Sequence, residues 1–244
     1  MKIDFHVHTY YSYDSFIRPV DLVARSIAFG VVPAIADHNT VAAHETFKSL
    51  GVPFIPAEEI GTDIGDLIGL FITEEIKKHT PFEEALDLIH EQGGIAYLPH
   101  MFDLTRHGIS DPKLASKVDI IEIFNSRCLD KSLNSKAKQF AEQNNLPGAV
   151  GTDSHFIFEF GKTYTEIPKF SFDGLENPNV LLKALKTQNP NPKTGCGKPG
   201  TGHTTLNTKP KTGNPTHETH PAPFYVRGTT SVLALGKKFL LRGF

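Results

Sequence analysis

The chain has 244 residues and a nearly balanced charge, with 25 Lys and Arg against 27 Asp and Glu. This length predicts one large domain or two small ones, and no run of about 18 apolar residues occurs that could span a membrane as a helix. The N-terminal residues show neither the apolar core nor the cleavage site of a signal peptide, and only Cys128 and Cys196 are cysteines. We therefore expect a cytoplasmic protein without a membrane partner, a disulfide framework or a thiolate zinc cluster.

The balanced charge hides two unlike parts. Residues 187–244 carry eight Lys and Arg and one acidic residue, whereas residues 1–186 carry 17 basic and 26 acidic residues. Nine of the 12 histidines lie in this acidic part. A protein that coats nucleic acid is basic, so the acidic, histidine-rich part favours a protein that concentrates cations.

Short apolar runs alternate with helical patterns up to about residue 186. The strands expected from these runs cover residues 3–7, 31–36, 52–57, 67–72, 95–98, 118–124 and 149–152. Helices are expected over residues 19–29, 40–50, 80–92 and 131–144, and the third opens with a capping box at Thr80–Glu83. Repeated strand–helix units with apolar strands indicate an α/β fold with a mainly parallel sheet. Its length suits a small or distorted βα barrel, or an open doubly wound sheet.

The composition changes after residue 186. Residues 187–223 are rich in Pro, Gly and Thr and poor in apolar residues, so they cannot bury enough surface to offset the entropy of ordering. We interpret them as a disordered linker between a domain of residues 1–186 and a basic amphipathic helix within residues 224–244. That helix either docks on the domain or contacts RNA or an acidic partner.

Polar side chains that can bind metals follow almost every expected strand. They are His6 and His8, Asp37 and His38, Glu58 and Glu59, His100, Asn125, and Asp153 with His155. Carboxyl ends of parallel strands face one side of a sheet, and side chains two apart on a strand share a face. Each residue alone is more often a surface or hydrogen-bonded side chain. The joint pattern, however, would be unfavourable unless cations neutralised it, and its donors suit Mn, Fe or Zn.

The same residues fall into ordered motifs. These are Asp4–Thr9, Ser12–Ser15, Ala36–Thr40, Glu58–Ile60, Pro99–His100 and Gly151–His155. Their combination resembles the PHP (polymerase and histidinol phosphatase) superfamily of metal-dependent phosphoesterases, over residues 1 to about 186. The chain looks most like the small stand-alone members. Residues 224–244 also resemble a short PHP-associated C-terminal segment, and the stretch before them looks like an insertion.

The resemblance implies a distorted (β/α)7 TIM-like barrel that holds two or three divalent metal ions. The ligands carried over are His6, His8, Glu59 and Asp153 for the first ion, Glu59 and His100 for the second, and Asp14, His38 and His155 for the third. Many relatives have a histidine where this chain has Asp66. Asp66 is therefore either a ligand that favours Mn over Zn at the second ion, or a loop residue before a strand.

The resemblance also implies hydrolysis of phosphate esters by a metal-bound hydroxide. The catalytic candidates are Asp153, Arg127 and Arg106, since arginine presents a bidentate fork to phosphate. Arg106 could instead be a solvated loop residue. The expected substrate is a small phosphorylated molecule, a nucleotide or a short nucleic acid. Alternatives are a histidinol-phosphate-type phosphatase, hydrolysis of C–N bonds, and a non-catalytic metal-binding module; the oligomeric state stays open.

Overall fold

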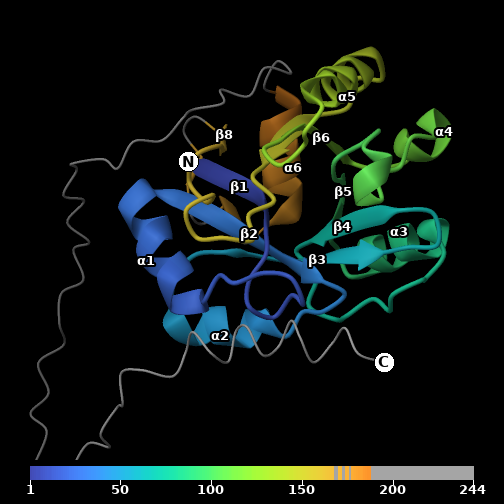
Figure 1. The fold of residues 1–244 in the computed structure, drawn as a ribbon. Helices are drawn as coiled ribbons and strands as arrows, with labels where there is room; N and C mark the ends of the chain where they lie inside the picture. The colour runs from blue at the N-terminus through green and yellow to red at the C-terminus, as the bar shows by residue number, and fades with distance from the viewer. Residues whose placement is uncertain (168–169, 172–173, 176, 188–244) are drawn as a thin grey trace, which may run out of the picture. The chain divides into compact units, whose positions relative to one another are not determined.

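A computed structural model of the protein describes residues 1–167, 170–171, 174–175 and 177–187 (Figure 1). The strands are β1 (Lys2–Val7), β2 (Val31–His38), β3 (Ile55–Gly61), β4 (Asp66–Leu70), β5 (Ile95–Leu98), β6 (Ile120–Asn125), β7 (Gly148–Gly151) and β8 (Thr165–Glu166). The helices are α1 (Pro19–Phe29), α2 (Ala43–Leu50), α3 (Phe82–Glu91), the 3-10 helix η1 (Leu104–Arg106), α4 (Pro112–Ala115), α5 (Lys131–Gln143) and α6 (Pro178–Thr187). The expected basic helix within 224–244, and all of the expected linker except Thr187, lie outside the described residues.

The strands form one sheet that is nearly closed into a barrel, in the order β7-β6-β5-β4-β3-β2-β1-β8. β4 is antiparallel to both β3 and β5, and β8 is antiparallel to β1; the other neighbours pair in parallel. β4 follows β3 without the crossover helix that a parallel pair requires. The sheet closes between β1 and the end of β7. There Val7 forms a parallel β-bridge with Ser154, and the Asp153 N–H donates to the His6 carbonyl at 2.7 Å. The expected α/β barrel is confirmed.

All seven expected strands are present, but β8 and α6 were not predicted. β8 pairs only Thr165 and Glu166 with the start of β1, and two residues are too few to show a periodic pattern. In α6, Leu181 and Leu185 are buried one helical turn apart. Its apolar stripe is short, so its place in the fold comes from packing rather than from its own sequence.

The start of α3 differs from the expected capping box. Pro81 occupies the N-cap, and the Thr80 hydroxyl donates to the Lys77 carbonyl instead of accepting from the helix. The Phe82 N–H is satisfied by Asp63 Oδ1 at 2.9 Å. A side chain from a distant loop thus replaces the local cap.

The hydrophobic core closes one end of the barrel and leaves the other end to polar residues. Leu181 and Leu185 of α6 belong to the same buried cluster as Ile55, Ile95 and Ile120, which are the first residues of β3, β5 and β6. α6 therefore covers the amino ends of the parallel strands, behind the sheet in Figure 1. The carboxyl ends are left to form a site.

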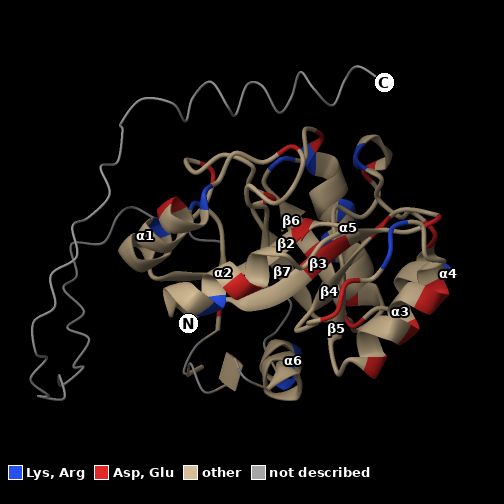
Figure 2. Ribbon diagram, turned by 90° about the horizontal axis from the view of Figure 1, so that it is seen from below, with Lys and Arg blue, Asp and Glu red and all other residues tan. Residues whose placement is uncertain are grey.

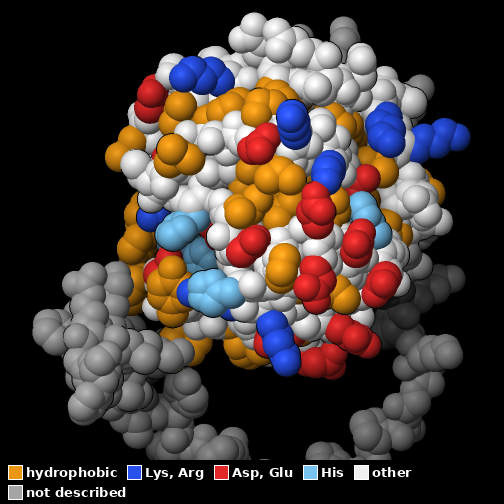
Figure 3. All heavy atoms as spheres, turned by 90° about the vertical axis from the view of Figure 1, so that its right-hand side faces the viewer, with side chains coloured by type: hydrophobic (Ala, Val, Ile, Leu, Met, Phe, Trp, Pro, Cys, Tyr) orange, Lys and Arg blue, Asp and Glu red, His pale blue; other side chains and the backbone are white. Residues whose placement is uncertain are grey.

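Part of the negative charge lies on the surface rather than at this end. Acidic side chains gather on the face shown in Figure 3, and α3 carries an exposed acidic row, red in Figure 2, made of Glu83, Glu84, Asp87 and Glu91.

Among the described residues, no helix is both long and apolar enough to cross a membrane.

Candidate metal centre

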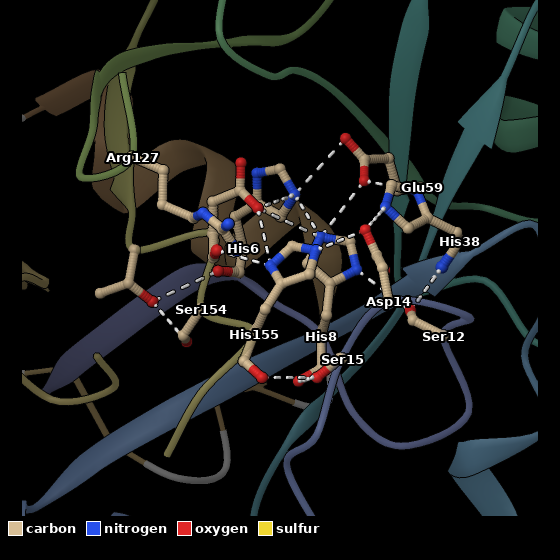
Figure 4. Close-up of polar contacts among 12 residues, drawn as sticks. His6, His8, Ser12, Asp14, Ser15, His38, Glu59, Arg127, Ser154 and His155 are labelled. Atoms are coloured by element: carbon tan, nitrogen blue, oxygen red, sulfur yellow. Dashed lines mark hydrogen bonds and ion pairs between the residues drawn. The ribbon is translucent and has the colours of Figure 1, made fainter. Parts of the chain in front are cut away.

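The carboxyl ends of the strands bring histidines and carboxylates from distant parts of the chain together. His6 lies in β1, His38 ends β2 and Glu59 lies in β3. The set is completed by His8 just after β1, Asp14 before α1, Asp66 at the start of β4, His100 after β5, and Asp153 and His155 after β7. Figure 4 shows His6, His8, His38 and His155 turned toward Glu59 and Asp14. The structure places all nine metal-ligand candidates in one cluster.

The first group, made of the ligands expected for the first ion (His6, His8, Glu59 and Asp153), lies at the centre of this cluster and is buried. The Nε2 atoms of His6 and His8 lie 2.9 Å apart. Glu59 Oε1 lies 3.4 Å from His6 Nε2, and Glu59 Oε2 lies 3.2 Å from His8 Nε2. Asp153 Oδ1 lies 3.8 Å and 3.5 Å from the same two nitrogens. None of these four residues is more than 1% exposed.

Two further groups adjoin the first. Glu59 Oε1 also lies 3.0 Å from His100 Nε2, and a donor atom of Asp66 lies within 4.8 Å of both residues. Asp66 therefore faces the cluster instead of lying apart in a loop. On the other side, Asp14 Oδ2 lies 3.1 Å from His155 Nε2 and 3.7 Å from His38 Nε2. Glu59 Oε2 also lies 3.0 Å from His38 Nδ1, so Glu59 borders all three groups.

Hydrogen bonds behind the cluster fix which nitrogen of each central histidine faces inward. His6 Nδ1 lies 3.2 Å from Glu122 Oε1, and His8 Nδ1 lies 3.2 Å from Ser12 Oγ. Ser12 Oγ in turn donates to Asp37 Oδ1 at 2.7 Å. A histidine whose outer nitrogen is held in this way presents a lone pair on Nε2 to the centre.

Glu122 is the functional residue that the sequence reasoning missed. Its buried carboxylate accepts from the Tyr97 hydroxyl at 3.0 Å, the His100 N–H at 2.6 Å and Asn125 Nδ2 at 2.9 Å, besides contacting His6. The available signal was a single carboxylate inside the otherwise apolar run of β6. Asn125, which was expected at this end of the sheet, is buried beside it.

Two of the carboxylates expected at this end point elsewhere. Asp37 accepts from the Thr9 N–H and hydroxyl, both at 2.6 Å, and Glu58 Oε2 accepts from the Ile76 N–H at 2.9 Å. Successive side chains of a strand alternate between its faces. Since His38 and Glu59 face the cluster, their neighbours Asp37 and Glu58 cannot.

The crowding of charges shifts the pKa values in opposite directions. Burial would lower the pKa of His6, but the carboxylates of Asp153, Glu59 and Glu122 outweigh it and hold that pKa well above its usual value. Burial would raise the pKa of Glu59, but His6 and His38 hold it well below its usual value. For Asp66, burial and the charge of Glu59 raise the pKa to about 7. A cation bound among these groups would stabilise the negative charge of the carboxylates.

The donor set fits divalent ions. Among the described residues, Asp14 Oδ1, Glu59 Oε2, Asp153 Oδ1 and His100 Nδ1 are buried and take part in no hydrogen bond. Nitrogen and oxygen donors bound to one ion at about 2.0 to 2.2 Å lie about 3.0 to 3.5 Å from each other, close to the separations above. Imidazole and carboxylate donors suit Mn, Fe or Zn.

Backbone constraints keep the ligands in place. Asp153 and His100 adopt left-handed φ values of 54° and 30°, which non-glycine residues rarely adopt and which concentrate at functional sites. At Gly151, an added Cβ would lie 2.2 Å from Glu122 Oε1 and 2.4 Å from the His6 Cβ. Only glycine lets β7 approach the cluster this closely.

The two arginine candidates lie at the edge of the cluster. Arg106 pairs with Asp153 Oδ2 and donates from Nη1 to Asn125 Oδ1 at 3.2 Å, so it is not a solvated loop residue. Arg127 extends toward the cluster (Figure 4), and its buried Nη1 has no hydrogen-bond partner among the described residues. His44 and His90 lie outside the cluster, against the Ala57 backbone and Asp119.

Sequence comparison supports the family that the motifs suggested. A model of the PHP-associated family matches residues 131–189, upstream of residues 224–244, for which that likeness was expected. Uncharacterized protein MJ0417 of Methanocaldococcus jannaschii is 40% identical over 190 residues, which are 74% of this chain and 75% of the relative.

Two solved structures share the fold. A two-domain protein from Bacteroides vulgatus containing a predicted PHP-like metal-dependent phosphoesterase aligns with a TM-score of 0.58 and 18% identity, over 76% of this chain and 62% of that one. Endonuclease Q, in complex with a duplex substrate that has an abasic lesion at the active site, aligns with a TM-score of 0.50 and 13% identity, over 80% of this chain and 58% of that one. The chain spans less than two thirds of either structure. By its motifs, its fold and these matches, the chain belongs to the PHP superfamily, with a PHP-associated region at residues 131–189.

Proposed function

We propose that the protein is a metal-dependent phosphoesterase that hydrolyses small phosphate esters, nucleotides or oligonucleotide ends. The observation that carries the proposal is the set of buried carboxylate oxygens, on Asp14, Glu59 and Asp153, that accept no hydrogen bond from the described residues although imidazoles surround them. Leaving such atoms without a partner is costly, so the arrangement is best explained by bound cations. His6, His8, Glu59 and Asp153 would hold one ion, His100 and Asp66 with Glu59 a second, and Asp14, His38 and His155 a third.

Divalent ions held there would polarise the phosphoryl oxygen and activate a water molecule for in-line attack. The protein's own part is to bind and orient the phosphate. Arg127 offers a guanidinium whose buried Nη1 has no hydrogen-bond partner in the described part of the chain, and Arg106 lies beside Asp153. Arginine matches the geometry of phosphate oxygens and remains charged at neutral pH. Asp153 Oδ2 accepts from Asn125 Nδ2 at 3.0 Å, which leaves Oδ1 facing His6 and His8.

The hydroxyl and thiol groups near the centre support direct attack by water over a covalent enzyme intermediate. Ser12 Oγ donates to Asp37, and Ser15 Oγ donates to the His8 carbonyl at 3.1 Å. Ser154 Oγ is paired with the Thr152 hydroxyl at 2.8 Å. Burial raises the pKa of the Cys128 thiol to about 11, so it is protonated at neutral pH. Each of these groups has a structural partner or is inactive as a nucleophile.

Elemental analysis and a substrate panel test the proposal. We expect the purified protein to bind at least two divalent ions per chain and to hydrolyse an aryl phosphate or a short RNA with added Mn²⁺. His6→Ala and Asp153→Ala should abolish both, whereas His90→Ala, which removes a histidine outside the cluster, should leave both intact. Activity that survives His6→Ala together with Asp153→Ala, or that is absent with every ion tried, would refute it.

The same panel separates the alternatives. Two bound ions with no turnover of any ester would identify a non-catalytic metal-binding module. Hydrolysis restricted to histidinol phosphate, with rescue of a histidine auxotroph, would identify the phosphatase alternative.

A further inference from the structure

Three phenylalanine rings form a stacked row beside the candidate metal centre. The ring centroids of Phe16 and Phe156 lie 5.4 Å apart with planes 13° from parallel, and those of Phe156 and Phe158 lie 5.6 Å apart at 17°. We call these three residues the ring row. Near-parallel rings at this spacing are offset-stacked, and the outer rings, Phe156 and Phe158, are exposed enough to take a further planar group.

Two residues of the ring row lie next to candidate ligands in the sequence. Phe156 follows His155 directly, and Phe16 lies two residues after Asp14. The Phe16 N–H donates to the His155 carbonyl at 2.9 Å, and the side chains of Asp14 and His155 meet at 3.1 Å. The same contacts that position these two ligands therefore position the first two rings.

Packing of the barrel does not account for the outer rings. Phe156 is 38% exposed and Phe158 is 58% exposed, whereas the neighbouring Ile17 and Phe160 are fully buried and supply the core contacts of the same two segments. Phe156 and Phe158 thus remain exposed while other residues of the same two segments fill the core. Exposed aromatic side chains next to a site commonly mark a binding surface.

The charge around the row suits a phosphorylated ligand. The ammonium of Lys162 lies 5.6 Å from the centre of the Phe158 ring. Glu159, the acidic residue of this segment, is turned inward, where its Oε2 accepts from the N–H groups of His155 and Phe156 at 2.8 and 2.9 Å. Aromatic faces combined with a basic side chain are how proteins bind bases joined to a phosphate backbone.

We propose that the ring row stacks the base of a nucleoside phosphate whose phosphate group lies in the metal centre. The inference rests on the proposed phosphoesterase function and names its substrate class, because stacking would favour nucleotides over phosphate esters that have no aromatic group. Phe156 and Phe158 are then specificity-determining residues that take no part in the bond cleavage.

The chain contains no tryptophan, so Phe158→Trp introduces a single indole at the outer ring. Adenosine monophosphate added to this variant, loaded with Mg²⁺, should quench the indole emission at first mixing, and ribose 5-phosphate should not. Val180→Trp is the matched control, since Val180 is 44% exposed on α6, which covers the opposite end of the barrel. Equal quenching by both ligands, or none by adenosine monophosphate, would overturn the inference.

Steady-state kinetics test the ring row independently of the fluorescence measurement. In Phe158→Ala, the ratio of kcat/KM for adenosine monophosphate to that for glycerol phosphate should fall about 5- to 100-fold, as expected for losing one base stack, and Phe158→Tyr should restore it. An unchanged ratio together with an altered oligomeric state would show that the row is a protein interface instead. Base-dependent quenching without turnover of any ester would refute only the proposed function, whereas turnover without base-dependent quenching would refute only the ring row.

Discussion

Replacing Glu122 with glutamine should weaken metal binding, although it changes none of the proposed ligands. The carboxylate holds His6 through Nδ1 at 3.2 Å and the His100 N–H at 2.6 Å, so it orients ligands of two groups at once. Glutamine keeps the size of the side chain, but its amide presents only one oxygen to the several donors that now surround the carboxylate. Loss of such a supporting partner typically lowers metal affinity about 10- to 100-fold, which corresponds to about 1.4 to 2.7 kcal/mol.

The assay is a competition titration with a chromophoric chelator, run on the wild type and on Glu122→Gln. Glu84→Gln, an exposed position on α3, serves as the matched control and should bind metal like the wild type. Circular dichroism establishes that the variant is folded. If folded Glu122→Gln binds metal within about twofold of the wild type, the role assigned to this carboxylate is wrong.

Three further predictions concern stability, each measured by urea denaturation. Gly151→Ala should destabilise the fold by more than about 2 kcal/mol, because its Cβ would meet Glu122 and His6. Leu181→Ala should cost about 2 to 5 kcal/mol, since that side chain is fully buried beneath the barrel; a cost below about 1 kcal/mol would contradict the packing of α6. Burial lowers the pKa of His44 below its usual value of 6.5, so this side chain takes up a proton more readily in the unfolded chain than in the folded one. The free energy of unfolding therefore decreases as the pH falls below about 6.5. The cost of His44→Gln should therefore be larger at about pH 7.5 than at about pH 5.5, and the opposite trend would refute this assignment.

Much of the framework could be predicted from local sequence. Seven strands are apolar runs that end in polar or turn residues, and the period of two placed His6 and His8 on one face. The bounds of α1 followed from Pro19 at its start and Gly30 at its end, which adopts a left-handed φ of 62°. These features depend on neighbouring residues, so the amino-acid order alone carries them.

Features that depend on distant contacts were decided only by the tertiary structure. The local pattern could not tell whether Glu58 or Glu59 faces the cluster, because strand alternation fixes only that the two differ. Nor could it place Glu122 behind His6, which lies 116 positions away in the chain, or bring α6 beneath the barrel. The sequence by itself determined which residue types gather at the carboxyl ends of the strands. Closure of the sheet decided which of them meet, because only closure brings β7 beside β1.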